Sequence, residues 1–147
     1  MTQEIITSNE VRIAEPQCNH GPIKEVLIVD DEETLLLSIN DGLSVYQKYF
    51  TLHTATNGVD AVKLLKSTPS IDLILTDLKM PKMDGFELLT YIKRNFPQTP
   101  VILMTAYGTP KIEEIVRTLG VYGYLEKPLD IQIIAETIFK ALNIKHH

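Results

Sequence analysis

The chain has 147 residues, of which 44% are hydrophobic and 22% charged, which is typical of one globular domain with a single core. Its 14 basic and 19 acidic residues give a formal net charge of −5, and the basic residues form no cluster, which argues against nucleic acid as a direct partner. No window approaches the ~20 apolar residues of a membrane span, and no secretory signal opens the sequence. Together with the single cysteine, Cys18, these features lead us to expect a cytoplasmic protein.

Residues 1–23 do not share the regular pattern of the rest of the chain. They hold scattered apolar positions, followed by Pro16, Gly21 and Pro22. Two interpretations remain open for this extension. Either it is partly disordered, or its segment Val11–Ala14 docks on the domain or on a neighbouring molecule.

From residue 24 onward, short apolar runs rich in β-branched residues alternate with segments whose apolar residues recur at helical spacing. This alternation predicts βα units around a parallel sheet that is buried on both faces. The predicted strands are Val26–Asp30, Phe50–Ala55, Ile71–Asp77, Val101–Thr105 and Val121–Leu125. The helical apolar positions fall within Leu35–Leu43, Ala61–Leu65, Leu88–Ile92, Ile112–Leu119 and Leu129–Leu142.

Several residues mark the expected ends of these helices. Asn57-Gly58 alone suggests a hairpin turn, but the helical spacing just after it favours a helix start. Asp84 and Glu87 form a capping box for the third helix, and Thr109-Pro110 supplies an N-cap followed by a first-turn proline. Gly120 is expected to end the fourth helix.

The last helix carries one apolar residue away from its apolar face. At 100° per residue from Ile131, the buried face is expected to hold the positions Ile134, Ala135, Ile138 and Leu142. Ile133 falls at about 200°, so we expect it to be exposed. It is either an ordinary surface residue or part of a patch used in self-association or partner docking.

Polar residues follow four of the predicted strands. The first strand leads into Asp30-Asp31, the third ends at Thr76-Asp77, the fourth at Thr105-Ala106, and Lys127 follows the fifth. Ligands bind beyond the carboxyl ends of the strands in open parallel sheets. We therefore expect these residues to meet at one edge of the sheet and to form the functional site.

Three carboxylates at this edge need compensation. At an effective dielectric of about 20, two like charges 4 Å apart cost about 4 kcal/mol. Lys127 supplies one positive charge and a divalent cation would supply two, and an oxygen-lined site suits Mg²⁺. The alternative for each aspartate alone is that Asp31 only caps the first helix and that Asp30 is solvated.

The segments VLIVDDE, LILTDLKMPKMDGFELL, VILMTAYG and GYLEKPLD occur in this order and spacing, and they resemble the receiver domain of two-component response regulators. The resemblance covers residues 24–143. It implies a flavodoxin-like α/β fold, with a doubly wound five-stranded parallel sheet of order 2-1-3-4-5 and five helices. Residues 144–147 then form a C-terminal tail, whose adjacent histidines are typical of a purification-tag remnant.

The resemblance also implies roles for individual residues. Asp77 matches the phosphoacceptor, and Asp30 and Asp31 match the acidic pair that holds Mg²⁺ together with Asp77 and the backbone carbonyl of Lys79. Lys127 matches the family's lysine, which precedes a proline that is often in a cis bond.

The matched residues suit in-line attack of the Asp77 carboxylate on phosphorus. Mg²⁺, Lys127, the Thr105 hydroxyl and the backbone N–H groups of Leu78 and Ala106 are the expected contacts of the phosphoryl oxygens. The module would thus catalyse its own phosphorylation and dephosphorylation without being an enzyme toward other substrates.

Thr105 and Tyr124 match the family's switch pair. Movement of Thr105 toward the phosphoryl group would let Tyr124 turn inward and change the face formed by the fourth helix, the fifth strand and the fifth helix. The residues alone, without the resemblance, favour a simpler interpretation, in which Tyr124 is an amphipathic ring at a sheet edge and Thr105 an ordinary strand residue.

The resemblance implies a sensor histidine kinase or a phosphotransfer protein as donor, a downstream protein partner, and self-association on activation. Nucleic acid and membrane are not expected as direct partners. The chain is either a free-standing regulator or a fragment of a longer one, because no output domain follows Asn143.

Two other functions were weighed. One is a Mg²⁺-dependent phosphohydrolase with Asp77 as nucleophile, but such enzymes place a second aspartate two residues later, where this chain has Lys79. The other is a binding module that works without phosphorylation.

Overall fold

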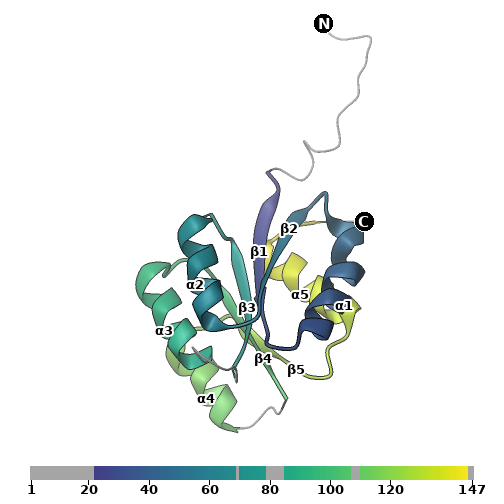
Figure 1. Cartoon of the computed structure of the whole chain (residues 1–147). Helices are drawn as coiled ribbons and strands as arrows, with labels where there is room; N and C mark the ends of the chain where they lie inside the picture. Colours follow the sequence, from purple (N-terminus) through teal and green to yellow (C-terminus); the bar gives the residue numbers. More distant parts are fainter. Residues whose placement is uncertain (1–21, 69, 79–84, 107–109, 146–147) are drawn as a thin grey trace, which may run out of the picture.

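The computed structural model describes residues 22–68, 70–78, 85–106 and 110–145, and in this part of the chain five parallel strands form one sheet (Figure 1). The strand order is β2-β1-β3-β4-β5, as the resemblance implied. The strands are β1 (Lys24–Val29), β2 (Phe50–Ala55), β3 (Leu73–Asp77), β4 (Val101–Thr105) and β5 (Gly123–Glu126). The helices are α1 (Glu33–Leu43), the short 3-10 helix η2 (Ser44–Tyr46), α2 (Gly58–Ser67), α3 (Gly85–Asn95), α4 (Pro110–Leu119) and α5 (Ile131–Leu142).

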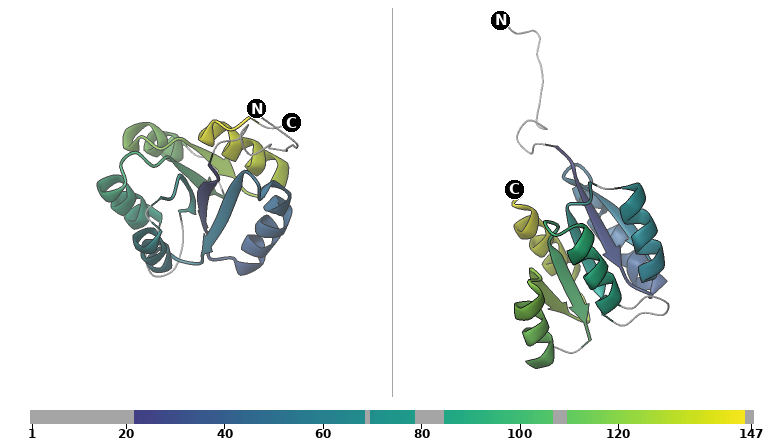
Figure 2. Two further views of the ribbon diagram at one scale, coloured as in Figure 1. Left: turned by 90° about the horizontal axis from the view of Figure 1, so that it is seen from above. Right: turned by 90° about the vertical axis from the view of Figure 1, so that its left-hand side faces the viewer.

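Helices cover both faces of the sheet, as the left view in Figure 2 shows from above. Val26 and Ile28 of β1 pack with residues of α1 and α5, whereas Leu27 and Val29 pack with residues of α2 and α3. All four side chains are 0% exposed. Burying one such aliphatic side chain contributes about 1.5–3 kcal/mol, so the central strands contribute strongly to stability. The prediction of a sheet buried on both faces is confirmed.

The strands Phe50–Ala55 and Val101–Thr105 have the predicted bounds, but the other three differ from the prediction. β1 begins at Lys24, because the Lys24 N–H donates to the Tyr49 carbonyl at 3.1 Å and extends the pairing with β2. β3 begins at Leu73, since the Asp72 carboxylate turns to accept the Glu25 N–H at 2.8 Å. β5 runs over Gly123–Glu126, two residues later than predicted at its start.

The helix ends follow from local hydrogen bonds. Asn57 is the N-cap of α2 and accepts the Asp60 N–H at 2.8 Å, so the helix start was the right interpretation and the hairpin turn was wrong. Asp130 caps α5 by accepting the N–H groups of Gln132 and Ile133, and the helix therefore begins at Ile131 rather than at Leu129. The predicted caps Asp84 and Thr109 lie outside the described residues.

Two glycines adapt the backbone to its neighbours. Gly120 follows α4 with φ 66°, which confirms that it ends this helix, and its carbonyl accepts a hydrogen bond from Lys93 Nζ at 2.9 Å. Gly42 lies in α1 where a Cβ would stand 2.9 Å from Cγ2 of Ile131, so α1 and α5 approach each other closely at this point.

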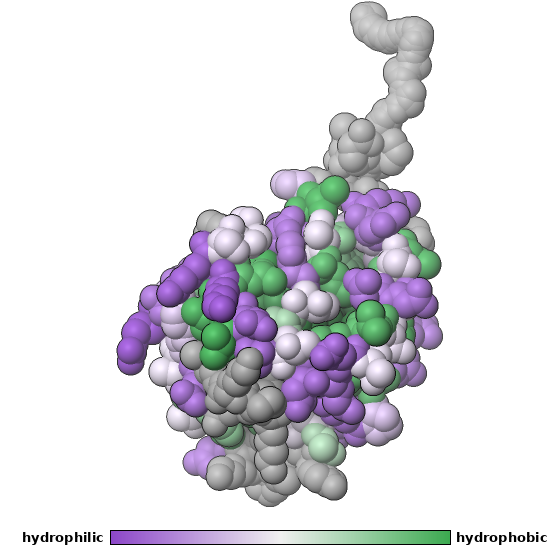
Figure 3. Space-filling view, in the orientation of Figure 1, coloured by the Kyte–Doolittle hydropathy of each residue, from purple (hydrophilic) through white to green (hydrophobic). Residues whose placement is uncertain are grey.

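The surface of the domain is mixed in character. On the face shown in Figure 3, small apolar areas lie between hydrophilic side chains. Ile133 is 51% exposed, as its position on α5 predicted. No helix in the described part of the chain combines the length and the apolar character needed to cross a membrane. Residues 1–21, with the predicted docking segment Val11–Ala14, and residues 146–147 lie outside the described residues.

Replacing Gly120 with alanine should lower the free energy of unfolding by about 1 kcal/mol, because an L residue at positive φ is strained even where space is open. Gly123 is the matched control, since a Cβ there also meets nothing within 4 Å and its φ is not in the left-handed region. Urea unfolding of Gly120→Ala and Gly123→Ala would measure both changes. Equal free energies for the two variants would contradict the explanation.

Candidate functional site

The sheet brings three carboxylates together at the carboxyl ends of its central strands, at the lower end of the sheet in Figure 1. Asp30 directly follows β1, Asp77 is the last residue of β3, and these two strands are paired. One carboxylate oxygen each of Asp30, Asp31 and Asp77 lies within 4.8 Å of the others. Asp30 and Asp77 are buried, whereas Asp31 is exposed. The predicted acidic cluster is therefore formed by the fold.

Lys127 reaches this cluster from the segment after β5. Its Nζ lies 2.8 Å from Asp30 Oδ2, 3.2 Å from Asp77 Oδ2 and 3.4 Å from Glu32 Oε1. Burial alone would lower the pKa of Lys127, but the contact and charge of Asp30, and then those of Asp77, raise this pKa above its ordinary value. Lys127 is therefore a charged ammonium at neutral pH.

The backbone fixes Lys127 in this position. Its N–H donates to the Thr105 carbonyl at 2.7 Å, which ties the segment after β5 to the end of β4. The peptide bond between Lys127 and Pro128 is cis, as the resemblance implied.

Asp30 has one satisfied and one unsatisfied carboxylate oxygen. Oδ1 accepts the Glu32 N–H at 2.9 Å, whereas the buried Oδ2 accepts no hydrogen bond from the described residues and is compensated by the nearby charge of Lys127. A buried carboxylate oxygen without a hydrogen bond retains the capacity to coordinate a cation. The alternative interpretation was wrong on both points, because Asp30 is 0% exposed and the N-cap of α1 is Glu32 rather than Asp31.

The backbone around Asp77 is also closely held. Thr76 Oγ1 donates to the Asp77 carbonyl at 3.0 Å, and the Gly85 N–H donates to the Leu78 carbonyl at 2.9 Å. A Cβ on Gly85 would overlap the Asp77 carbonyl oxygen and would lie 2.5 Å from Cα of Leu78. The start of α3 can pass this close to the site only with glycine at position 85.

The remaining predicted site residues lie at the same edge or near it. Thr105 is the last residue of β4 and is 8% exposed, and Leu78 and Ala106 directly follow β3 and β4. Lys79 lies outside the described residues.

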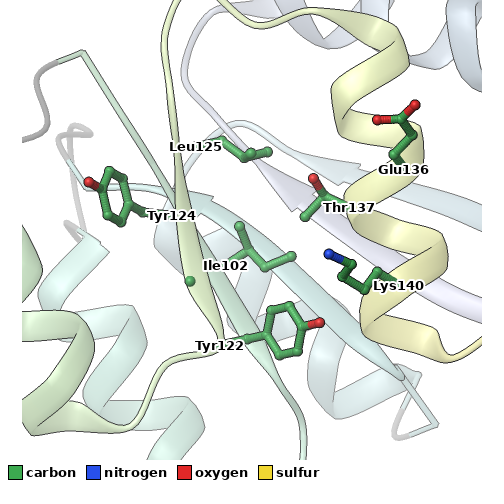
Figure 4. A pocket seen from close by; sticks show the side chains of 8 residues that line it. Ile102, Tyr122, Tyr124, Leu125, Glu136, Thr137 and Lys140 are labelled. Atoms are coloured by element: carbon green, nitrogen blue, oxygen red, sulfur yellow. The ribbon is translucent and has the colours of Figure 1, made fainter.

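Tyr124 lies farther from the carboxyl ends of the strands. It stands beside Leu103 in the register of β4 and β5, so it shares a face of the sheet with Thr105 but lies two positions before the strand end. Its ring packs against the core on the α2 and α3 side, and Figure 4 shows it on the opposite side of β5 from Leu125.

Two contributors, Gly85 and Glu32, were missed in the sequence. Gly85 acts through backbone geometry, which the pattern of apolar residues does not encode. Glu32 was missed because Glu32 and Glu33 follow Asp31 as equivalent acidic residues. Their position just after the end of β1 predicts that both lie near the site, but it does not show which of the two contacts Lys127.

Comparison with known proteins identifies the family. The family model described as the response regulator receiver domain matches residues 26–139. The chemotaxis protein CheY of Treponema pallidum is 33% identical over 141 residues, which cover 95% of this chain and 96% of that protein. The crystal structure of the signal receiver domain of an HD domain-containing protein from Pseudomonas fluorescens has a TM-score of 0.73 and 31% identity, with 92% of this chain and 93% of that chain covered.

Other relatives are considerably longer than this chain. The transcriptional regulatory protein GlrR of Escherichia coli is 32% identical over 124 residues, which cover 84% of this chain but 27% of that protein. The chain thus spans about a quarter of the length of such relatives. Since the family model matches more than half of the chain, and the fold and the site agree with it, the chain belongs to the receiver domains of two-component response regulators, which are phosphoacceptor modules.

Proposed function

We propose that Asp77 is the phosphoacceptor of this receiver domain and that Lys127 and a Mg²⁺ ion on Asp30, Asp31 and Asp77 support its phosphorylation. The observation that carries this proposal is the position of the Asp77 carboxylate. It lies at the end of a central strand, within 4.8 Å of the other two acids and 3.2 Å from the Lys127 ammonium.

The residues present fit a magnesium ion. All three side-chain ligands would be carboxylate oxygens, which hard cations prefer, and Asp30 also has a buried oxygen, Oδ2, that accepts no hydrogen bond from the described residues. The family resemblance implies the backbone carbonyl of Lys79 as a further ligand. When bound, Mg²⁺ would offset the charge of the acidic cluster and of the phosphoryl oxygens.

The Asp77 carboxylate would act as the nucleophile. A new bond forms between one of its oxygens and phosphorus while the bond from phosphorus to the donor breaks, which leaves an acyl phosphate on Asp77 and the electron pair on the leaving group. Strand β3 holds the carboxylate in place, so little orientational freedom is lost during attack. The donor is a histidine kinase, a phosphotransfer protein or a small acyl phosphate.

The phosphoryl oxygens need positive partners that are already in place. The Lys127 ammonium lies 3.2 Å from the Asp77 carboxylate. The Leu78 N–H directly follows Asp77 at the end of β3, and the Thr105 hydroxyl and the Ala106 N–H come from the end of the neighbouring strand β4. Because the domain supplies these groups itself, we infer that it catalyses its own phosphorylation and the later hydrolysis of the acyl phosphate.

We further propose that Thr105 and Tyr124 read out this state. A phosphoryl group brings a charge of about −1.5 to −2, which would draw the Thr105 hydroxyl toward it and leave space beside β4. Tyr124 stands on the neighbouring strand and on the same face of the sheet, and its ring is only partly buried. The ring can therefore turn into that space and alter the face formed by α4, β5 and α5.

This face offers a place for a downstream protein. A cavity of about 500 Å³ lies between β5 and α5, and Figure 4 shows Tyr122, Thr137 and Lys140 around it. Ile133 is exposed on the same helix. A partner of mixed polar and apolar surface would match these side chains.

Incubation with acetyl phosphate and Mg²⁺ should add one phosphoryl group to the protein, detected by intact-mass analysis. Asp77→Asn should abolish the addition, because an amide is not a competent nucleophile here. Asp41→Asn removes an exposed carboxylate from α1 and is the control that should still be modified. An unreduced yield of acyl phosphate in Asp77→Asn would show that the acceptor is misassigned.

Asp77→Asn should melt at a higher temperature than the wild-type protein in metal-free buffer of low salt. The reason is that the substitution removes one of the like charges that lie within 4.8 Å of one another. Glu136→Gln, which removes an exposed carboxylate from α5, controls for the change in net charge. A melting temperature equal to or below that of the wild type would count against repulsion within the cluster.

Magnesium should stabilise the folded domain by binding only the native state. The expected gain is about 2.7 kcal/mol when Mg²⁺ exceeds its dissociation constant a hundredfold. Thermal melts of the wild type and of Asp31→Asn across a Mg²⁺ titration would measure it, with the smaller gain in the variant. A wild-type melting temperature that does not respond to millimolar Mg²⁺ would remove the metal from the mechanism.

A further inference from the structure

Glu32 occupies the N-cap position of α1, but its side chain serves another contact. In the described part of the chain its carboxylate makes no capping hydrogen bond, and glutamate is not among the preferred N-cap residues. Its N–H donates to Asp30 Oδ1 at 2.9 Å, which fixes the start of its side chain beside the acidic cluster. From there its Oε1 reaches Lys127 Nζ at 3.4 Å, across 95 residues of sequence.

The Lys127 ammonium is therefore shared by three carboxylates. It has three N–H groups, and it lies near one oxygen each of Asp30, Asp77 and Glu32. Two of these N–H groups donate to Asp77 and Glu32, and Asp30 holds the ammonium as an ion-pair partner, so a phosphoryl oxygen that is to contact Lys127 competes with these carboxylates. The identity of the carboxylate that gives way then influences how tightly the phosphoryl group is held.

The three contacts differ in how easily they can be exchanged. Asp30 is 0% exposed and has the shortest contact, at 2.8 Å, so withdrawing the ammonium would leave a buried charge unpaired. Asp77 is the residue to be modified. The Glu32 side chain is 61% exposed and has the longest contact, so water can replace the ammonium there at little cost.

We propose that Glu32 is a positioning residue that competes with the phosphoryl group for Lys127, and that it thereby lowers the affinity of the site for this group. The inference rests on the proposed function, because it assumes that the phosphoryl group is carried by Asp77. Phosphorylation replaces the single charge of this carboxylate with about −1.5 to −2 charges. Repulsion between the new group and Glu32 adds to the competition.

Beryllofluoride provides a test, because with Mg²⁺ it forms a phosphoryl-like group on an aspartate. Its dissociation constant should be measured by calorimetry at saturating Mg²⁺ for the wild type and for Glu32→Gln. This substitution keeps the length of the side chain and removes its charge, and binding should tighten about threefold, as expected for the loss of an exposed ion pair.

Two further variants separate the contact from the general effect of charge. Glu33→Gln removes the same charge from the adjacent, exposed residue in the first turn of α1, and it should change the dissociation constant by much less. Glu32→Asp shortens the side chain by one methylene but keeps the charge, so it should also tighten binding, by less than Glu32→Gln because the repulsion remains.

The outcomes are distinct. Equal effects of Glu32→Gln and Glu33→Gln would overturn the inference in favour of a general effect of charge. Unchanged or weaker binding in Glu32→Gln, or wild-type affinity in Glu32→Asp, would overturn it as well. Failure of beryllofluoride to bind the wild-type protein would instead overturn the proposed function, and this inference with it.

Discussion

The Lys127 ammonium between Asp30 and Asp77 is the interaction on which the carboxyl-end edge of the sheet depends. Asp30 is 0% exposed, and a carboxylate at that depth requires a partner of opposite charge. The partner comes from the segment after β5, although β3 and β4 stand between β5 and β1. The Lys127 side chain therefore links the ends of β1, β3 and β5, and it holds a positive charge 3.2 Å from the Asp77 carboxylate.

The same arrangement leaves the edge of the sheet short of positive charge. One ammonium faces the carboxylates of Asp30, Asp77 and Glu32, with Asp31 close by. The apolar packing on both faces of the sheet stabilises the fold and offsets the repulsion among these carboxylates. The surplus of negative charge attracts a cation to the site. A phosphoryl group bound there would share the cation and the Lys127 ammonium with the carboxylates.

The sequence predicted most of the fold because each signal for it is local. Phe50–Ala55 and Val101–Thr105 match their strands, since their apolar runs coincide with the pairing of the backbone. The start of β3 was misjudged because Asp72 pairs with Glu25 partly through its side chain: its N–H donates to the Glu25 carbonyl, but its carboxylate accepts the Glu25 N–H. Asp30, Asp77 and Lys127 were identified by their positions after strands together with the family motif. The contact of Glu32 with Lys127 depends on a rotamer and on a residue far along the chain, and neither can be derived from spacing.

The close approach of α1 and α5 at Gly42 has a consequence for how the sequence can vary. The space that a Cβ would take at position 42 is filled by the Ile131 side chain, which belongs to the first turn of α5. The two positions share one volume, so a larger residue at 42 requires a smaller one at 131. We therefore expect the residues at positions 42 and 131 to vary together in size wherever these two helices pack in the same way.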